Sequence, residues 1–127
     1  VVLLLFATLT WQQNQIWASP KTLWEQAIKV SPESSFALNN MGNLALQADD
    51  IAGAREYYQR SAEVNPRNPT AHNNLGWLAE KNRDIPTALV HYRAFARLNN
   101  PVFRPQLKAL RDHLLRSYGV RIAVGER

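Results

Sequence analysis

A repeat of 34 residues organises most of this chain. When residues 35–68 are laid over residues 69–102, twelve positions carry the same amino acid, whereas average composition gives about two or three such matches. The matched pairs are Ala37/Ala71, Asn39/Asn73, Asn40/Asn74, Gly42/Gly76, Leu44/Leu78, Ala45/Ala79, Asp50/Asp84, Ile51/Ile85, Ala54/Ala88, Tyr58/Tyr92, Ala62/Ala96 and Asn65/Asn99. A period of this length is typical of arrays in which each unit stacks on its neighbour.

Each unit is predicted to contain two helices. In the first unit, one helix runs from about Phe36 to Ala48, and the second begins after Asp50, a good N-cap. The sister unit begins with Asn68 and Pro69, an N-cap followed by proline at the first helical position.

Glycine recurs in the middle of each first helix, as Gly42 and Gly76. Glycine costs about 1 kcal/mol there relative to alanine. A costly residue repeated at equivalent places indicates a close helix–helix contact that a Cβ atom would obstruct.

The flanking segments keep part of this pattern. Residues 19–34 resemble only the second half of a unit, in which Ser19 and Pro20 begin a helix and Trp24 aligns with Tyr58. Residues 103–118 are predicted to form a last helix that begins at Pro105 and presents one apolar face to the preceding unit. Residues 119–127 are expected to be a short, basic, frayed tail.

Composition limits the classes of function. The 127 residues include no cysteine, which excludes disulfide scaffolds, thiolate zinc sites and thiol nucleophiles. The net charge is +5, and residues 103–127 contribute most of it. Such a basic end suits phosphate in nucleic acid or lipid headgroups, although a solvated face on a terminal helix is the favoured interpretation.

The N-terminal residues 1–18 look like the end of a membrane segment. Val1 to Leu9 carry no charge, and Trp11 follows at the place of an interfacial aromatic residue. Nine apolar residues are too few to span a bilayer, which needs about twenty. We therefore expect a transmembrane helix that begins upstream, with a buried core helix or a signal-peptide remnant as alternatives. The first basic residue is Lys21, which favours a membrane-anchored domain on the non-cytoplasmic side.

The two units resemble the tetratricopeptide repeat, whose signature is W-x2-L-G-x2-Y, then A-x3-F, then P. The signature positions of the first unit are Leu38, Met41, Gly42, Ala45, Ala54, Tyr58 and Pro66, and those of the second are His72, Leu75, Gly76, Ala79, Ala88 and Tyr92. The resemblance implies an all-α helix-turn-helix solenoid: a half repeat at 19–34, full repeats at 35–68 and 69–102, and a capping helix at 103–118. The second unit departs from the family, with Asn100 in place of proline and Phe95 at a usually small position, so we expect it to end irregularly.

The resemblance also implies a protein-interaction scaffold in which a concave groove binds a partner peptide or protein. The residues expected in the groove are Phe36, Asn39, Asn40, Asn43, Gln47, Asn73, Asn74, Trp77 and Lys81. Asparagine amides both donate and accept hydrogen bonds, so they suit the backbone of an extended peptide. Two alternatives stay open: the asparagines cap or bridge neighbouring helices, and Trp77 is buried against the next helix.

A looser resemblance points to multi-pass membrane proteins of the O-mannosyltransferase-like group, which carry tetratricopeptide repeats outside the cytoplasm. It rests on Leu23-Trp24, Pro32 and the opening of the first full repeat after an apolar segment. It implies an accessory domain of a membrane glycosyltransferase whose catalytic part lies upstream of Val1.

Enzyme chemistry and nucleic-acid binding have less support. His72, His91 and His113 are far apart in the sequence, and no metal-binding or nucleophile motif is present. No catalytic residue, metal or cofactor is therefore predicted. Nucleic acid is a less favoured partner of the basic end, because only Phe103 and Tyr118 accompany its arginines there.

Overall fold

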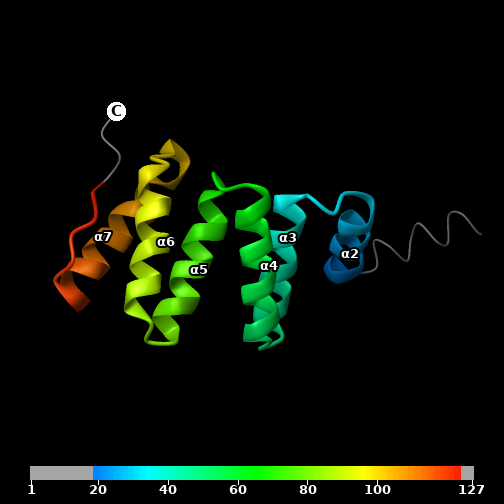
Figure 1. Ribbon diagram of the computed structural model, residues 1–127, viewed down its shortest axis with the longest axis horizontal. Helices are drawn as coiled ribbons and strands as arrows, with labels where there is room; N and C mark the ends of the chain where they lie inside the picture. The colour runs from blue at the N-terminus through cyan, green and yellow to red at the C-terminus, as the bar shows by residue number, and fades with distance from the viewer. Residues whose placement is uncertain (1–18, 124–127) are drawn as a thin grey trace, which may run out of the picture. The chain divides into compact units, whose positions relative to one another are not determined.

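The computed structural model describes residues 19–123 of the chain, and these residues form helices without any strand. The helices are α2 (Pro20–Val30), α3 (Ser35–Gln47), α4 (Ile51–Val64), α5 (Pro69–Lys81), α6 (Ile85–Arg97) and α7 (Arg104–Tyr118), with a 3₁₀ turn η1 (Pro101–Phe103) before α7 (Figure 1). They divide into two compact units, which we call unit 1, up to Val64, and unit 2, from Asn65.

Helix starts follow the capping residues that the sequence supplies. The Ser19 side chain accepts a hydrogen bond from the Thr22 backbone N–H and completes a capping box at the start of α2. Asn68 accepts from the N–H groups of Thr70 and Ala71 at the start of α5, with Pro69 at the first helical position. The predicted helix starts at Ser19-Pro20 and Asn68-Pro69 are therefore confirmed.

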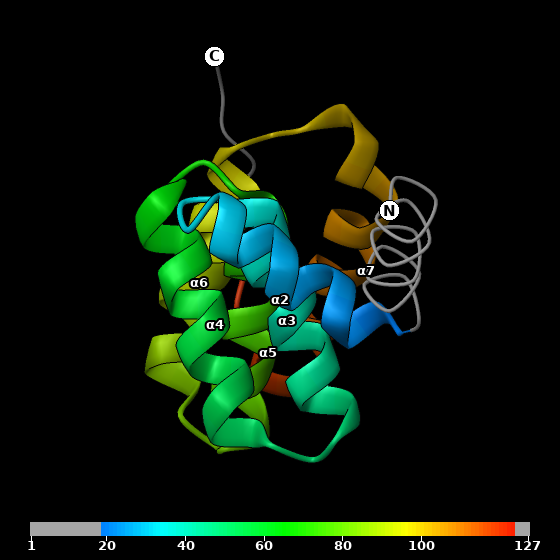
Figure 2. The same cartoon turned by 90° about the vertical axis from the view of Figure 1, so that its right-hand side faces the viewer.

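Unit 1 is built around the antiparallel pair of α3 and α4, which lie side by side in Figures 1 and 2. Leu38 and Tyr58 are the largest side chains at their interface and are at most 1% exposed. At one end of the pair, Ser61 Oγ donates to the Ser35 carbonyl at 2.8 Å, and Ser35 Oγ donates to the Ser61 carbonyl at 3.0 Å. α2 packs on α3, where the rings of Trp24 and Phe36 meet edge to face at 5.4 Å.

Unit 2 repeats this hairpin with α5 and α6 and adds α7. One apolar core joins them; its members are Ala79, Ala88, Tyr92, Phe95, Ala96, Leu107, Leu114 and Ile122. Phe95 occupies the place that small Ser61 holds in unit 1, and its ring packs edge to face on Phe103 at 5.9 Å. After this position α6 ends at Arg97, and η1 stands between it and α7. The irregular end that the sequence predicts for this unit is thus confirmed.

The close approach predicted at the two glycines is also confirmed. A Cβ atom on Gly42 would lie 2.5 Å from the Tyr58 ring, and one on Gly76 would lie 2.5 Å from the Tyr92 ring. Real Cβ contacts are longer, so each tyrosine ring lies against the helix at a place where only glycine leaves enough room. The same contact therefore closes both hairpins.

Two expectations about the ends of the chain need comment. The predicted transmembrane end over residues 1–18 lies outside the described residues, and none of the helices from 19 to 123 is long and apolar enough to cross a bilayer. The predicted frayed tail is wrong for residues 119–123, because Ile122 is only 3% exposed and belongs to the core of unit 2.

Candidate partner-binding site

A pocket of about 510 Å³ opens in unit 2 between the first helix of the hairpin and the capping helix. It is lined by Asn73, Trp77, Glu80 and Lys81 of α5, Tyr92 of α6, and Ala109, Leu110 and His113 of α7. Asn73, Trp77 and Lys81 belong to the groove predicted from the sequence. The spacing 73, 77, 80, 81 places all four α5 residues on one face of the helix.

Trp77 and Lys81 form the accessible part of this pocket. The Lys81 ammonium lies over the Trp77 ring, 4.7 Å from its centroid, which is within the range of a cation–π interaction. Trp77 is 38% exposed. An exposed tryptophan held by a neighbouring cation offers a rigid apolar surface and a positive charge to the same ligand.

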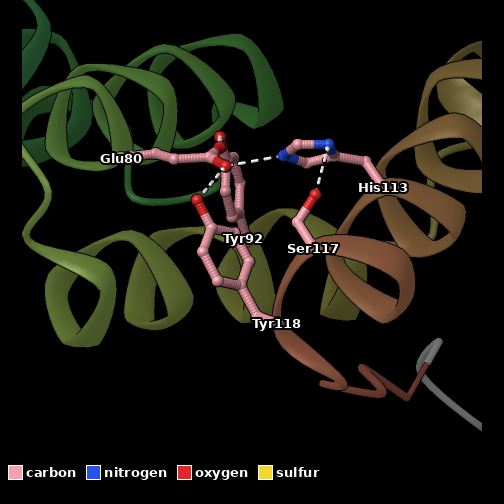
Figure 3. Close-up of polar contacts among 5 residues, drawn as sticks. All are labelled: Glu80, Tyr92, His113, Ser117 and Tyr118. Atoms are coloured by element: carbon pink, nitrogen blue, oxygen red, sulfur yellow. Dashed lines mark hydrogen bonds and ion pairs between the residues drawn. The ribbon is translucent and has the colours of Figure 1, made fainter.

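Glu80 forms the inner wall of the pocket and connects three elements (Figure 3). Its Oε2 accepts a hydrogen bond from Tyr92 Oη at 2.8 Å. Its Oε1 accepts from His113 Nε2 at 2.6 Å and from Tyr118 Oη at 2.9 Å. A carboxylate in the last turn of a helix is unfavourable in the field of the helix dipole, and these three donors compensate for that placement.

The environment of Glu80 favours its ionised form. Burial acts to raise the pKa of this carboxyl, but the hydrogen bonds from His113, Tyr92 and Tyr118 outweigh burial and lower the pKa below its usual value. Burial and the bond to Glu80 raise the pKa of Tyr92. The carboxylate is therefore charged and fully engaged, and Lys81 supplies the charge that a ligand would meet in the pocket.

Unit 1 satisfies its buried tyrosine with a different acceptor. Tyr58 Oη donates to Asn43 Oδ1 at 2.7 Å, and burial raises the pKa of Tyr58 to about 12. The position equivalent to Asn43 is Trp77 in unit 2, where the acceptor is Glu80, one helical turn later. Moving the acceptor by one turn leaves position 77 available for an exposed tryptophan.

The five groove residues predicted in unit 1 have mixed surroundings. Phe36 is 69% exposed and Gln47 is exposed, whereas Asn39 is buried at 6% exposed. Asn40 Nδ2 donates to the Phe36 carbonyl of its own helix at 2.8 Å, and Asn43 accepts from Tyr58. Asn40 and Asn43 therefore bond to their own hairpin, which matches the alternative that the asparagines cap or bridge helices. A separate pocket in unit 1, of about 270 Å³, is lined by none of the five.

The structure also pairs two histidines that are far apart in the sequence. His72 Nδ1 and His91 Nδ1 lie 3.3 Å apart, and His72 Nε2 donates to the Pro66 carbonyl at 2.9 Å. Burial, followed by the charge of His72, lowers the pKa of His91. No group of three or more metal-ligating side chains occurs in the described part of the chain.

Sequence reasoning missed Glu80 and the histidine pair. A signal for Glu80 was present, because the repeat has Leu46 at the equivalent position, and a carboxylate replacing a leucine on a packed helix needs donors. Its donors lie up to 38 residues away, and only the folded arrangement of α5, α6 and α7 identifies them.

A family model described as tetratricopeptide repeat matches the chain twice, over residues 4–61 and 39–101. The chain belongs to the tetratricopeptide repeat family. In each of its two hairpins a glycine of the first helix packs against a tyrosine of the second. Comparison with curated proteins gives no match.

Membership of the family defines the general role of the fold. Tetratricopeptide repeats are protein–protein interaction scaffolds, and the fold is typically non-catalytic. The chain therefore has the fold of a scaffold for protein or peptide partners.

Proposed function

We propose that the pocket lined by Asn73, Trp77 and Lys81 binds a peptide segment of a partner protein. The observation that carries the proposal is the Trp77–Lys81 pair, which is exposed in the same pocket as Glu80, whose carboxylate is already engaged by three hydrogen-bond donors. Tryptophan is enriched at sites that dominate binding energy. The amide of Asn73 in the lining supplies a donor and an acceptor for a peptide backbone.

The test is a selection of binders from a random peptide library on the 127-residue chain, followed by affinity measurements on variants. We expect Trp77→Ala to weaken the selected peptides about thirtyfold, the equivalent of about 2 kcal/mol for a residue that dominates an interface. Asn73→Ala, which removes an amide of the lining, is expected to weaken them by about tenfold or less.

The control is Val90→Ala, which truncates an exposed apolar residue of α6 in the same unit; Val90 is 62% exposed and does not line the pocket. Its affinity should equal that of the wild type. Unchanged affinity of folded Trp77→Ala for every selected peptide would remove the proposal.

We further propose that the domain is tethered to a membrane on the non-cytoplasmic side, as part of a larger membrane protein. The support is the uncharged run from Val1 to Leu9, followed by Trp11 and by no basic residue before Lys21. An accessory role beside a membrane glycosyltransferase is the alternative that this sequence suggests. Alkaline extraction of the native protein tests the tether: release into the aqueous fraction would contradict it.

A further inference from the structure

A second pocket, of about 330 Å³, lies on the other side of the capping helix in unit 2. It is lined by Lys108, Arg111, Asp112 and Leu115 of α7 and by Arg121 and Ile122 of the segment that follows. The first pocket uses positions 109, 110 and 113 of α7, which helical spacing places on the opposite face from 108, 111, 112 and 115. The two pockets are therefore separate surfaces.

The turn at the end of α7 builds this second pocket. Gly119 adopts φ +66°, a left-handed conformation that suits glycine. Its N–H donates to the Leu115 carbonyl at 3.0 Å, and the N–H of Val120 donates to the Leu114 carbonyl at 3.2 Å. The chain turns back, and Ile122 packs into the core at 3% exposed. This anchor fixes Arg121 beside α7.

Three cations thus converge on one hollow. Lys108, Arg111 and Arg121 are exposed, and within residues 19–123 no carboxylate lies within ion-pair distance of any of them. Asp112 is the single acidic side chain in the lining. Converging like charges repel one another, and an anion bound between them relieves that repulsion.

Part of the lining of the hollow is apolar. Leu115 is 45% exposed there, and buried Ile122 completes the lining. A ligand that fills the pocket must therefore carry an aliphatic group close to its negative charges. Asp112 can accept hydrogen bonds from the backbone N–H groups of a peptide, which a phosphate group does not supply.

We propose that this pocket, the cap pocket, binds an acidic segment of a partner protein in which aliphatic residues alternate with glutamates or aspartates. Carboxylates of the segment pair with Lys108, Arg111 and Arg121, and one aliphatic side chain covers Leu115. Nucleic acid fits less well, because no aromatic side chain on which a base could stack is among the described residues that line this pocket.

The experiment measures binding of a fluorescein-labelled peptide, in which pairs of glutamates flank single leucines, to the 127-residue chain by anisotropy. We expect Arg111→Gln combined with Arg121→Gln to weaken the peptide about tenfold or more, because two paired charges are lost. Leu115→Ser should weaken it as well, while leaving its salt dependence unchanged. Affinity of the wild type should fall as salt rises.

A matched control removes two other exposed arginines of unit 2, in Arg93→Gln combined with Arg97→Gln. It has the same net charge as the test variant, and its affinity should stay within about twofold of the wild type. The same peptide with glutamine in place of glutamate should bind at least about tenfold more weakly.

Three outcomes would overturn the proposal. In the first, the peptide does not bind, or binds the test variant and the control equally. In the second, phosphatidylserine vesicles bind the chain more tightly than the peptide and lose that binding in the test variant, which would assign the cap pocket to lipid. In the third, a single-stranded oligonucleotide binds the chain more tightly than the peptide and loses that binding in the test variant, which would assign the cap pocket to nucleic acid. Circular dichroism of each variant establishes that the helices are intact.

Discussion

At the scale of single residues, the contact between a glycine and a tyrosine ring holds each hairpin closed. The rings of Tyr58 and Tyr92 occupy the space that a Cβ atom would take on Gly42 and Gly76. Both rings are buried, at 1% and 3% exposed. The repeat sequence predicted a close helix–helix contact here, because glycine is costly inside a helix and yet returns at the same position. It did not identify the tyrosine ring as the other side of that contact.

Gly76→Ala is expected to destabilise the chain by about 1–3 kcal/mol, because overpacking of the Tyr92 ring outweighs the better helix propensity of alanine. Urea unfolding measures the change. In a Tyr92→Leu background the same substitution should cost less, because the obstructing ring is absent. An equal loss of unfolding free energy in the two backgrounds would show that the tyrosine ring is not the reason why glycine is required at position 76.

At the hairpin turns, by contrast, backbone strain predicts that introducing a glycine stabilises the chain. Asp49 and Arg83 occupy equivalent positions, and each has φ +61°, a conformation that disfavours side chains with a Cβ atom. Arg83→Gly should therefore stabilise the chain by about 1 kcal/mol. The control Arg93→Gly, an exposed position inside α6, should destabilise it by about 1 kcal/mol. A Tm that falls in both variants would contradict the assignment of strain to position 83.

At the scale of elements, α7 is held by an apolar face and by the Glu80 hydrogen bonds together. Leu107 and Leu114 enter the core of unit 2, while His113 and Tyr118 reach across to α5. A helix that covers the last repeat needs one such apolar face and one face toward water. The sequence predicted the apolar face of α7, but it did not predict the polar contacts.

Two adjacent leucines test this division of α7. Leu114 is 1% exposed, whereas Leu115 is 45% exposed. Leu114→Ala should cost about 2–5 kcal/mol of unfolding free energy, as expected for a cavity in a core. Leu115→Ala should change it by about 0.5 kcal/mol or less. Equal losses from the two substitutions would mean that α7 presents a different face to the repeat.

At the scale of the whole described chain, the sequence predicted the order and limits of the helices much better than the site. Periodicity and capping residues act over a few neighbours, so the starts at Ser19-Pro20 and Asn68-Pro69 follow from local chemistry. Glu80 meets His113 and Tyr118 only after three helices have packed. Ile122 enters the core because the chain turns back at Gly119, which has a left-handed conformation. The basic composition of residues 119–127 gave no sign of this turn.

The pH dependence of unfolding is a property of the whole chain and follows from two lowered pKa values. The pKa of His91 lies below its usual 6.5 in the folded state, so the unfolded chain takes up a proton first as the pH falls below about 6.5. The pKa of Glu80 lies below its usual 4.5, so the unfolded chain again binds more protons as the pH falls below about 4.5. Stability should therefore decrease with acidity in both windows.

Single substitutions at His91 and Glu80 separate the contributions of these two groups to the pH dependence of stability. His91→Gln should flatten the stability profile between neutral pH and about 5, and Glu80→Gln should flatten it below about 4.5. The measurement is the urea midpoint as a function of pH. A wild-type midpoint that rises on acidification through either window would contradict the assigned direction of the shift.

The two tyrosine acceptors restrict how this repeat can be varied or transplanted. Asn43 serves Tyr58 in one hairpin, and Glu80 serves Tyr92 in the other from one turn further along. Position 77 can hold a tryptophan because Glu80, and not residue 77, accepts the hydrogen bond from Tyr92. If Trp77 is transplanted into another repeat of this kind, Glu80 must be transplanted with it, so that the buried tyrosine keeps an acceptor. If Glu80 is removed, an asparagine at position 77 could accept from Tyr92 instead, but the exposed tryptophan would then be lost.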